Sequence, residues 1–116
     1  MPVTIYGIPN CDTVKKARRW LDERSIAYQF HDYKKAGVSE ADLKRWAGED
    51  GWEKLLNRDG TTFRKLDERD KAGIDESKAI ELMAANPSMI KRPVVVGAPG
   101  GLLVGFREAE WEAAFS

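Results

Sequence analysis

Apolar residues recur along the chain with two different spacings, and each spacing predicts a type of element. The β-rich run at 3–6 predicts a strand. Over 13–24, Val14, Ala17 and Leu21 recur at i, i+3 and i+7, which predicts a helix with Asp12 or Thr13 as its N-cap. A second short strand is expected at 26–30. A strand, a helix of about three turns and a strand predict a βαβ unit with parallel pairing.

The middle of the chain predicts helices. Ser39, followed by Asp42 three residues on, resembles a weak capping box, and the apolar face after it continues to Gly48. A short helix is expected over 52–56, and a short helix or a loop over 61–66. A longer helix is predicted at 76–85, where Asn86-Pro87 ends it.

The last part of the chain predicts a hairpin and a closing helix. The valine run at 94–96 is typical of a buried strand, and a Gly- and Pro-rich turn leads to a returning strand at 102–105. Trp111 and Phe115, at i and i+4, mark a helix over 108–115. The order βαβ, helical segment, ββα predicts an α/β protein with four strands and helices on the faces.

Composition and charge narrow the class of protein further. The chain has 116 residues, 42% hydrophobic and 33% charged, which fits one globular domain. Nineteen Lys and Arg balance nineteen Asp and Glu, so the total charge gives no sign of a nucleic-acid or membrane partner. No apolar run approaches the roughly 18 residues of a membrane span, and the first residues lack a signal-peptide layout. One cysteine cannot form an internal disulfide, so we expect a cytoplasmic protein. Because the chain has only one cysteine and one histidine, we expect no metal site.

The single cysteine, Cys11, has three readings: a buried filler, half of a redox pair, or a nucleophile working alone. Free cysteine is often a small core residue, but Cys11 lies outside both the strand alternation and the helix stripe. It follows Pro9 and Asn10 in a tight turn at the carboxyl end of a strand, where open α/β sheets bind ligands. A helix N-terminus lowers the pKa of a thiol, and the free N–H groups of roughly 13–15 could point at the sulfur.

The residue three positions on decides between a pair and a lone thiol. Val14 stands where the second cysteine of a Cys-x-x-Cys motif would be, so that motif is absent. Exchange through a mixed disulfide remains open, with the second thiol supplied from outside. Lys15 is close enough to Cys11 to add positive charge, although the basic stretch at 15–19 also fits a solvated helix face.

Arg92 and Pro93 form a second candidate feature, just ahead of the valine strand. Arg92 fits a solvated surface charge. If this strand lies beside the first strand–helix turn, Arg92 would instead reach Cys11, where it could stabilise a thiolate or bind an oxyanion or carboxylate.

Four stretches of the chain together resemble a known family. Their sequences are Tyr6-Gly7-Ile8-Pro9-Asn10-Cys11-Asp12-Thr13-Val14-Lys15-Lys16-Ala17, Asp32-Tyr33-Lys34-Lys35, Leu55-Leu56-Asn57 and Ile90-Lys91-Arg92-Pro93-Val94-Val95. In this order they resemble the arsenate reductase (ArsC)/Spx family, and within it the small bacterial YffB-like proteins. The resemblance implies one thioredoxin-like, glutaredoxin-related domain over 1–116, with a four-stranded mixed sheet, a helical insertion at about 38–88 and a cis peptide bond before Pro93.

The resemblance also implies a site and an activity. Cys11 becomes the expected nucleophile and Arg92 its anion-binding partner. The first hypothesis is an oxidoreductase, a cytoplasmic glutathione-dependent thiol–disulfide reductase in which glutathione is a co-substrate and no cofactor is tightly bound. The substrate-binding residues expected around the thiol are Asn10, Asp12, Thr13, Val14, Lys15, Arg92 and Pro93.

Two alternatives follow from other branches of the same family. One is an arsenate reductase coupled to glutathione and glutaredoxin, or to another protein thiol. Its three arginines are only partly matched: Arg92 fits the second, Asn57 precedes Arg58 at the first, and Arg107 is roughly aligned with the third. Gly7 stands roughly where the usual histidine precedes the cysteine, and the family's Cys-Gly-Thr loop reads Cys-Asp-Thr. The other alternative is an Spx-like regulator that binds RNA polymerase, here without an internal disulfide switch.

Overall fold

The computed structural model describes residues 3–115, which separate into two compact units. One unit runs to Ala36 and resumes at Arg92; the other covers Gly37–Lys91. The second unit covers the segment where the family resemblance implies a helical insertion, at about 38–88.

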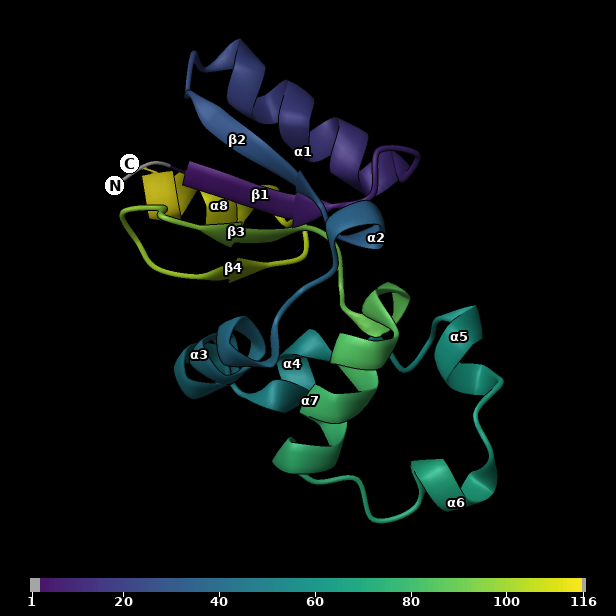
Figure 1. The fold of residues 1–116 in the computed structure, drawn as a ribbon. Helices are drawn as coiled ribbons and strands as arrows, with labels where there is room; N and C mark the ends of the chain where they lie inside the picture. Colours follow the sequence, from purple (N-terminus) through teal and green to yellow (C-terminus); the bar gives the residue numbers. More distant parts are fainter. Residues whose placement is uncertain (1–2, 116) are drawn as a thin grey trace. The chain divides into compact units, whose positions relative to one another are not determined.

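The first unit contains a four-stranded mixed sheet in the order β2-β1-β3-β4 (Figure 1). Its strands are β1 (Val3–Gly7), β2 (Tyr28–Asp32), β3 (Val94–Val96) and β4 (Leu103–Val104). The pair β1 and β2 is parallel, whereas β3 is antiparallel to both β1 and β4. The βαβ unit, the hairpin and the α/β class are therefore confirmed. The second strand begins and ends two residues later than predicted, because Ser25 and Ile26 are used in hydrogen bonds that close the preceding helix.

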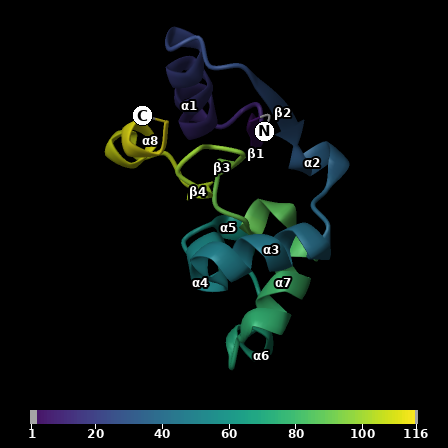
Figure 2. The same ribbon diagram turned by 90° about the vertical axis from the view of Figure 1, so that its left-hand side faces the viewer.

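Two helices, α1 (Asp12–Glu23) and α8 (Glu108–Phe115), cover the same face of this sheet, as Figure 2 shows. The core between them is apolar and contains Val3, Ile5, Ala17, Trp20, Leu21, Val95, Ala98, Leu103, Trp111 and Ala114. Val3 and Ile5 alternate with Thr4 along β1, as the period of a strand requires. Trp111 is fully buried; Trp20 at 5.5 Å and Phe106 at 4.9 Å meet it edge-on, an arrangement that adds about 0.5–1.5 kcal/mol per pair.

The start of α1 differs from the prediction. Cys11 is the N-cap, with extended backbone angles, and Asp12 is the first helical residue. The carbonyl oxygen of Cys11 accepts the first helical hydrogen bond, from the N–H of Lys15 at 2.9 Å. The turn before it closes when the N–H of Cys11 donates to the carbonyl oxygen of Ile8 at 3.3 Å. The backbone turn, and not a capping side chain, thus fixes where the helix begins.

The second unit is built from helices. Its elements are α3 (Glu40–Asp50), α4 (Trp52–Leu55), α5 (Thr61–Arg64), α6 (Glu68–Lys71), α7 (Glu76–Ala85) and the 3₁₀ turn η1 (Pro87–Met89). Ser39 caps α3 by accepting a hydrogen bond from the N–H of Asp42, as its spacing predicted. An antiparallel β-bridge between Leu56 and Ile90 connects the segment before α5 with the segment after η1. Next to it, the N–H of Asn57 donates to the carbonyl oxygen of Met89 at 2.7 Å.

Candidate functional site

The candidate site lies at the carboxyl edge of the parallel strands in the first unit. Three segments meet there: the turn between β1 and α1, the segment that follows β2, and the start of β3. Register explains why, because Gly7 at the end of β1 pairs with Asp32 at the end of β2, and Tyr6 pairs with Val94 of β3. Each segment supplies one polar side chain, and these are Cys11, Tyr33 and Arg92.

Cys11 is partly exposed, and its sulfur lies among groups that favour an anion. Burial alone would raise the pKa of the Cys11 thiol. The N–H of Val14, a hydrogen bond from the Arg92 guanidinium, the N–H of Thr13 and the charge of Arg92 outweigh burial and lower the pKa below its usual value. All of these groups stabilise the thiolate more than the thiol. The arrangement fits a thiolate that is available for reaction.

Arg92 is half-buried, and its guanidinium has two partners. It donates one hydrogen bond to the sulfur of Cys11 and another to the hydroxyl of Tyr33. Burial opposes its charge, but the proximity of Tyr33 and Cys11 more than compensates and raises the pKa of Arg92 above its usual value. Arg92 therefore keeps a full positive charge beside the sulfur.

Pro93 follows a cis peptide bond, as the family resemblance implied. The proline is buried, and its carbonyl oxygen accepts a hydrogen bond from the N–H of Gly105 at 2.8 Å. This bond ties the start of β3 to the end of β4. The backbone next to Arg92 is thereby held in place at the edge of the sheet.

The other predicted substrate-binding residues lie in the first turn of α1 or just before it. Asn10, Asp12, Thr13 and Lys15 are all exposed, so a ligand at Cys11 could reach them. Val14 is fully buried and offers only its backbone N–H to the site. The N–H of Lys15 is used inside the helix, so of the three amides expected at the sulfur only those of Thr13 and Val14 act there.

Gly7 and Val14 fit one another closely, which explains one departure from the family pattern. A Cβ atom at Gly7 would lie 2.9 Å from one methyl carbon of Val14, which is closer than Cβ atoms approach non-bonded neighbours in proteins. The first turn of α1 thus rests directly on the end of β1. A larger residue before the cysteine, such as histidine, would need a smaller one at position 14 or a shift of the helix.

The two remaining arginines of the arsenate pattern have other surroundings. Arg107 is exposed, and its carbonyl oxygen accepts the N–H of Trp111 in the first turn of α8. Arg58 belongs to the second unit, where its guanidinium lies 5.8 Å from the ring centre of Trp52. Asn57 is held by its backbone bond to Met89, and its side chain covers Gly60.

Tyr33 is the site residue that sequence reasoning missed. It is fully buried at the start of the four-residue helix α2 (Tyr33–Ala36), which the sequence did not predict. The only signal was its position directly after β2, at the edge where Cys11 was expected. Residues 3–115 contain no cluster of three or more metal-ligating side chains and no helix that could cross a membrane.

Comparison with known proteins gives a consistent result. The model of the ArsC family matches residues 6–114. The solved structure of a protein named YFFB is 58% identical, covers 98% of this chain and 99% of its own, and superposes with a TM-score of 0.92. The structure of an arsenate reductase related protein from Brucella melitensis is 55% identical over 100% of this chain and 96% of its own, with a TM-score of 0.75. A global transcriptional regulator Spx from Streptococcus mutans is 30% identical, covering 96% of this chain and 81% of the regulator.

Proposed function

The chain belongs to the ArsC family, and on that basis we propose that it is a glutathione-dependent thiol–disulfide reductase that uses Cys11 as its single nucleophile. The observation that carries the proposal is the lone thiol at the N-terminus of α1, beside Arg92, with Val14 in place of a second cysteine. Such a thiol can begin a disulfide exchange, but it needs an outside thiol to complete it.

The chemistry has two balanced steps. In the first, the Cys11 thiolate attacks the glutathionyl sulfur of a mixed disulfide between glutathione and a substrate thiol. The old sulfur–sulfur bond breaks, the substrate leaves as a thiolate that takes a proton, and Cys11 carries the glutathione. In the second step, the thiolate of another glutathione attacks the bound glutathione, forms oxidised glutathione and releases the Cys11 thiolate. The Thr13 and Val14 amides and Arg92 stabilise Cys11 as nucleophile in the first step and as leaving group in the second.

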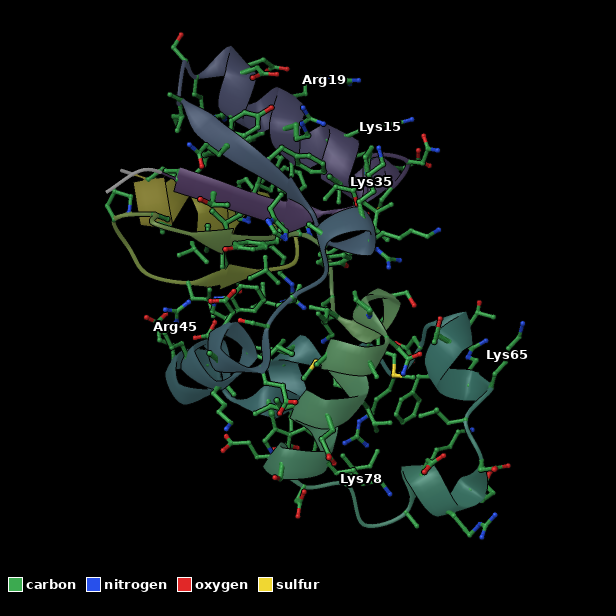
Figure 3. All side chains as sticks on the ribbon, in the orientation of Figure 1. Lys15, Arg19, Lys35, Arg45, Lys65 and Lys78 are labelled. Carbon is green, nitrogen blue, oxygen red and sulfur yellow. The ribbon has the colours of Figure 1, made fainter. Side chains whose placement is uncertain are left out.

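Charge around the thiol supports an anionic co-substrate such as glutathione, which carries two carboxylates. Lys15 and Lys16 follow β1 in α1, and Lys34 and Lys35 follow β2 in α2, all at the edge that holds Cys11. Among residues 3–115, none of these four lysines forms an ion pair. Lys15 extends outward from α1, as Figure 3 shows. The four lysines outnumber the two carboxylates at this edge, those of Asp12 and Asp32, so the edge attracts an anion even though the chain as a whole is neutral.

The direct test is turnover of a glutathionylated peptide by glutathione, followed by coupling oxidised glutathione to its reductase. We expect ping-pong kinetics, a Cys11–glutathione adduct detectable by mass spectrometry, and no activity in Cys11→Ser. The rate should fall as salt screens the four lysines. Efficient reduction of the adduct by thioredoxin, with no turnover by glutathione, would contradict the proposal.

Arsenate reduction is a second candidate because the Brucella melitensis structure is described as related to an arsenate reductase. Binding an oxyanion tightly needs several charge-assisted donors, whereas here a single guanidinium, that of Arg92, acts on the sulfur. We therefore expect arsenate turnover, with glutathione and glutaredoxin present, to be much slower than turnover of a mixed disulfide. Comparable rates would favour the arsenate reading.

A regulatory role is a third candidate, supported by the resemblance to Spx over nearly the whole chain. Pull-down of RNA polymerase by the wild type and by Cys11→Ser tests it. Binding that survives the substitution would indicate a binding module that does not need the thiol, whereas absence of binding would leave the reductase proposal in place.

A further inference from the structure

Tyr33 has an unusual setting for a tyrosine, because its whole side chain is buried at the edge of a small sheet. The backbone fixes it there. Asp32, the last residue of β2, pairs with Gly7 of β1, and its carboxylate accepts the N–H of Lys34 at 3.1 Å. Tyr33 therefore follows β2 at the same edge of the sheet as the turn that carries Cys11.

A buried hydroxyl needs a hydrogen-bond partner, and Tyr33 has one in Arg92. Arginine has no acceptor, so its guanidinium donates and the phenol oxygen accepts. The same guanidinium donates to the sulfur of Cys11. We propose that Tyr33 is a positioning residue, whose buried hydroxyl holds the Arg92 guanidinium against the sulfur of Cys11.

The proposal explains why this position carries a tyrosine rather than a phenylalanine. A phenylalanine ring would be buried at this position just as well, so burial alone does not account for the hydroxyl. Arg92 is only half-buried and its long side chain has many rotamers; an acceptor fixed in the protein interior selects the rotamer that reaches Cys11. The guanidinium is a rigid planar fork, so a bond on one of its edges orients the others.

The ionisation of the phenol is consistent with this role. Burial raises the pKa of Tyr33 to about 12. Arg92 partly opposes this rise, whereas the charges of Cys11 and Asp32 add to it. The phenol is therefore neutral at physiological pH. It accepts the hydrogen bond without cancelling the positive charge that Arg92 presents to the sulfur.

Tyr33→Phe tests the proposal through the chemistry of the only thiol. The rate of iodoacetamide alkylation is measured over a pH series. Losing the phenol oxygen that holds the guanidinium in place should slow alkylation of Cys11 about threefold near neutral pH and move its titration to higher pH. The matched control is Tyr28→Phe, because Tyr28 lies at the other end of β2 and its hydroxyl also accepts a bond from an arginine, Arg18, at 3.1 Å. We expect the control to leave alkylation unchanged.

A double-mutant cycle separates positioning from a structural effect. If Tyr33 acts through Arg92, Tyr33→Phe should have no further effect on alkylation in an Arg92→Met background. Equal effects of Tyr33→Phe in both backgrounds, or no effect in the wild type, would overturn the proposal. Because the cycle reads only thiol reactivity, its outcome does not depend on whether glutathione is the second thiol.

A measurement on Arg92 alone keeps the proposal testable if Tyr33→Phe does not fold. The chemical shift of the Tyr33 ring carbon that bears the hydroxyl reports the hydrogen bond from the guanidinium. We expect that shift to change in Arg92→Met and to stay in place in Arg107→Met, since Arg107 is exposed in the same unit. An unchanged shift in Arg92→Met would show that the guanidinium does not bind the phenol.

Discussion

Replacing Arg92 by lysine measures how far the reactivity of Cys11 depends on the shape of the guanidinium and not only on its charge. Lysine keeps the positive charge, but a single ammonium group on a flexible stem cannot hold Cys11 and Tyr33 together in a fixed planar geometry. The substitution therefore removes the oriented hydrogen bond to the sulfur and retains most of the long-range attraction.

The size of the effect follows from the burial of the pair. A hydrogen bond to a charged group contributes about 1.5–3 kcal/mol in favourable cases. Cys11 and Arg92 are both only half-buried, so solvent screening reduces this to about 1–1.5 kcal/mol. Alkylation of Arg92→Lys should accordingly be about five- to tenfold slower than that of the wild type near neutral pH.

The assay follows the alkylation of Cys11 between about pH 5 and pH 9 under pseudo-first-order conditions. Every modification reports on this one thiol, because the chain has no other cysteine. Arg107→Lys is the matched control, since Arg107 is exposed and outside the hydrogen bonds of the site. A wild-type profile for Arg92→Lys would refute the reasoning about guanidinium shape. An equal loss in Arg107→Lys would show that the third arginine of the arsenate pattern does act at the thiol.

Four further predictions concern stability and the missing second thiol. The pKa of the Cys11 thiol is lowered in the folded state, so the wild type should become more stable relative to Cys11→Ser as pH rises through the folded pKa. The full difference should be present above the unfolded pKa of about 8.5. Urea unfolding at several pH values measures the difference, and a value that does not change with pH would contradict the prediction. Val14→Cys should let Cys11 form an internal disulfide under mild oxidation, so that thiol titration falls from two to none without glutathione; two persistent thiols would be the contrary result. Gly100→Ala should cost about 1–3 kcal/mol, because its Cβ would lie 2.6 Å from Cα of Ala114. Gly48→Ala should stabilise α3 by up to about 1 kcal/mol, since nothing lies within 4 Å of its Cβ; thermal unfolding compares the two, and equal effects would contradict the geometry.

The sequence predicted best those elements whose apolar residues recur with a clear period. The stripe through Val14, Ala17 and Leu21 meets the sheet, and the helices at 76–85 and 108–115 have the predicted bounds. The helices α2 and α6 have four residues each, about one turn, which is too short to show any apolar period. The N-cap of α1 was misplaced because capping preferences favour side chains with a strong acceptor oxygen, and Cys11 has none.

The candidate site was predictable in part. The turn position of Cys11 and the absence of a partner at Val14 were visible in the residues alone. The pairing of Arg92 with Cys11 depended on β3 lying next to β1, a long-range fact that local patterns do not contain. Tyr33 could not be singled out, because a tyrosine after a strand has no distinguishing motif and its importance comes entirely from the partner that folding brings to it.

The buried methyl groups of Val14 have a consequence for the lifetime of the protein under oxidative stress. A thiolate as accessible as that of Cys11 is expected to react with peroxide and form a sulfenic acid. In proteins with a cysteine three residues on, the sulfenic acid is captured as a disulfide before it oxidises further. Here that position is Val14, whose buried side chain cannot react with it. Only a thiol arriving from solution can then prevent irreversible conversion to the sulfinic acid. We therefore expect the survival of the site in peroxide to depend on the surrounding thiol concentration and not on the protein itself.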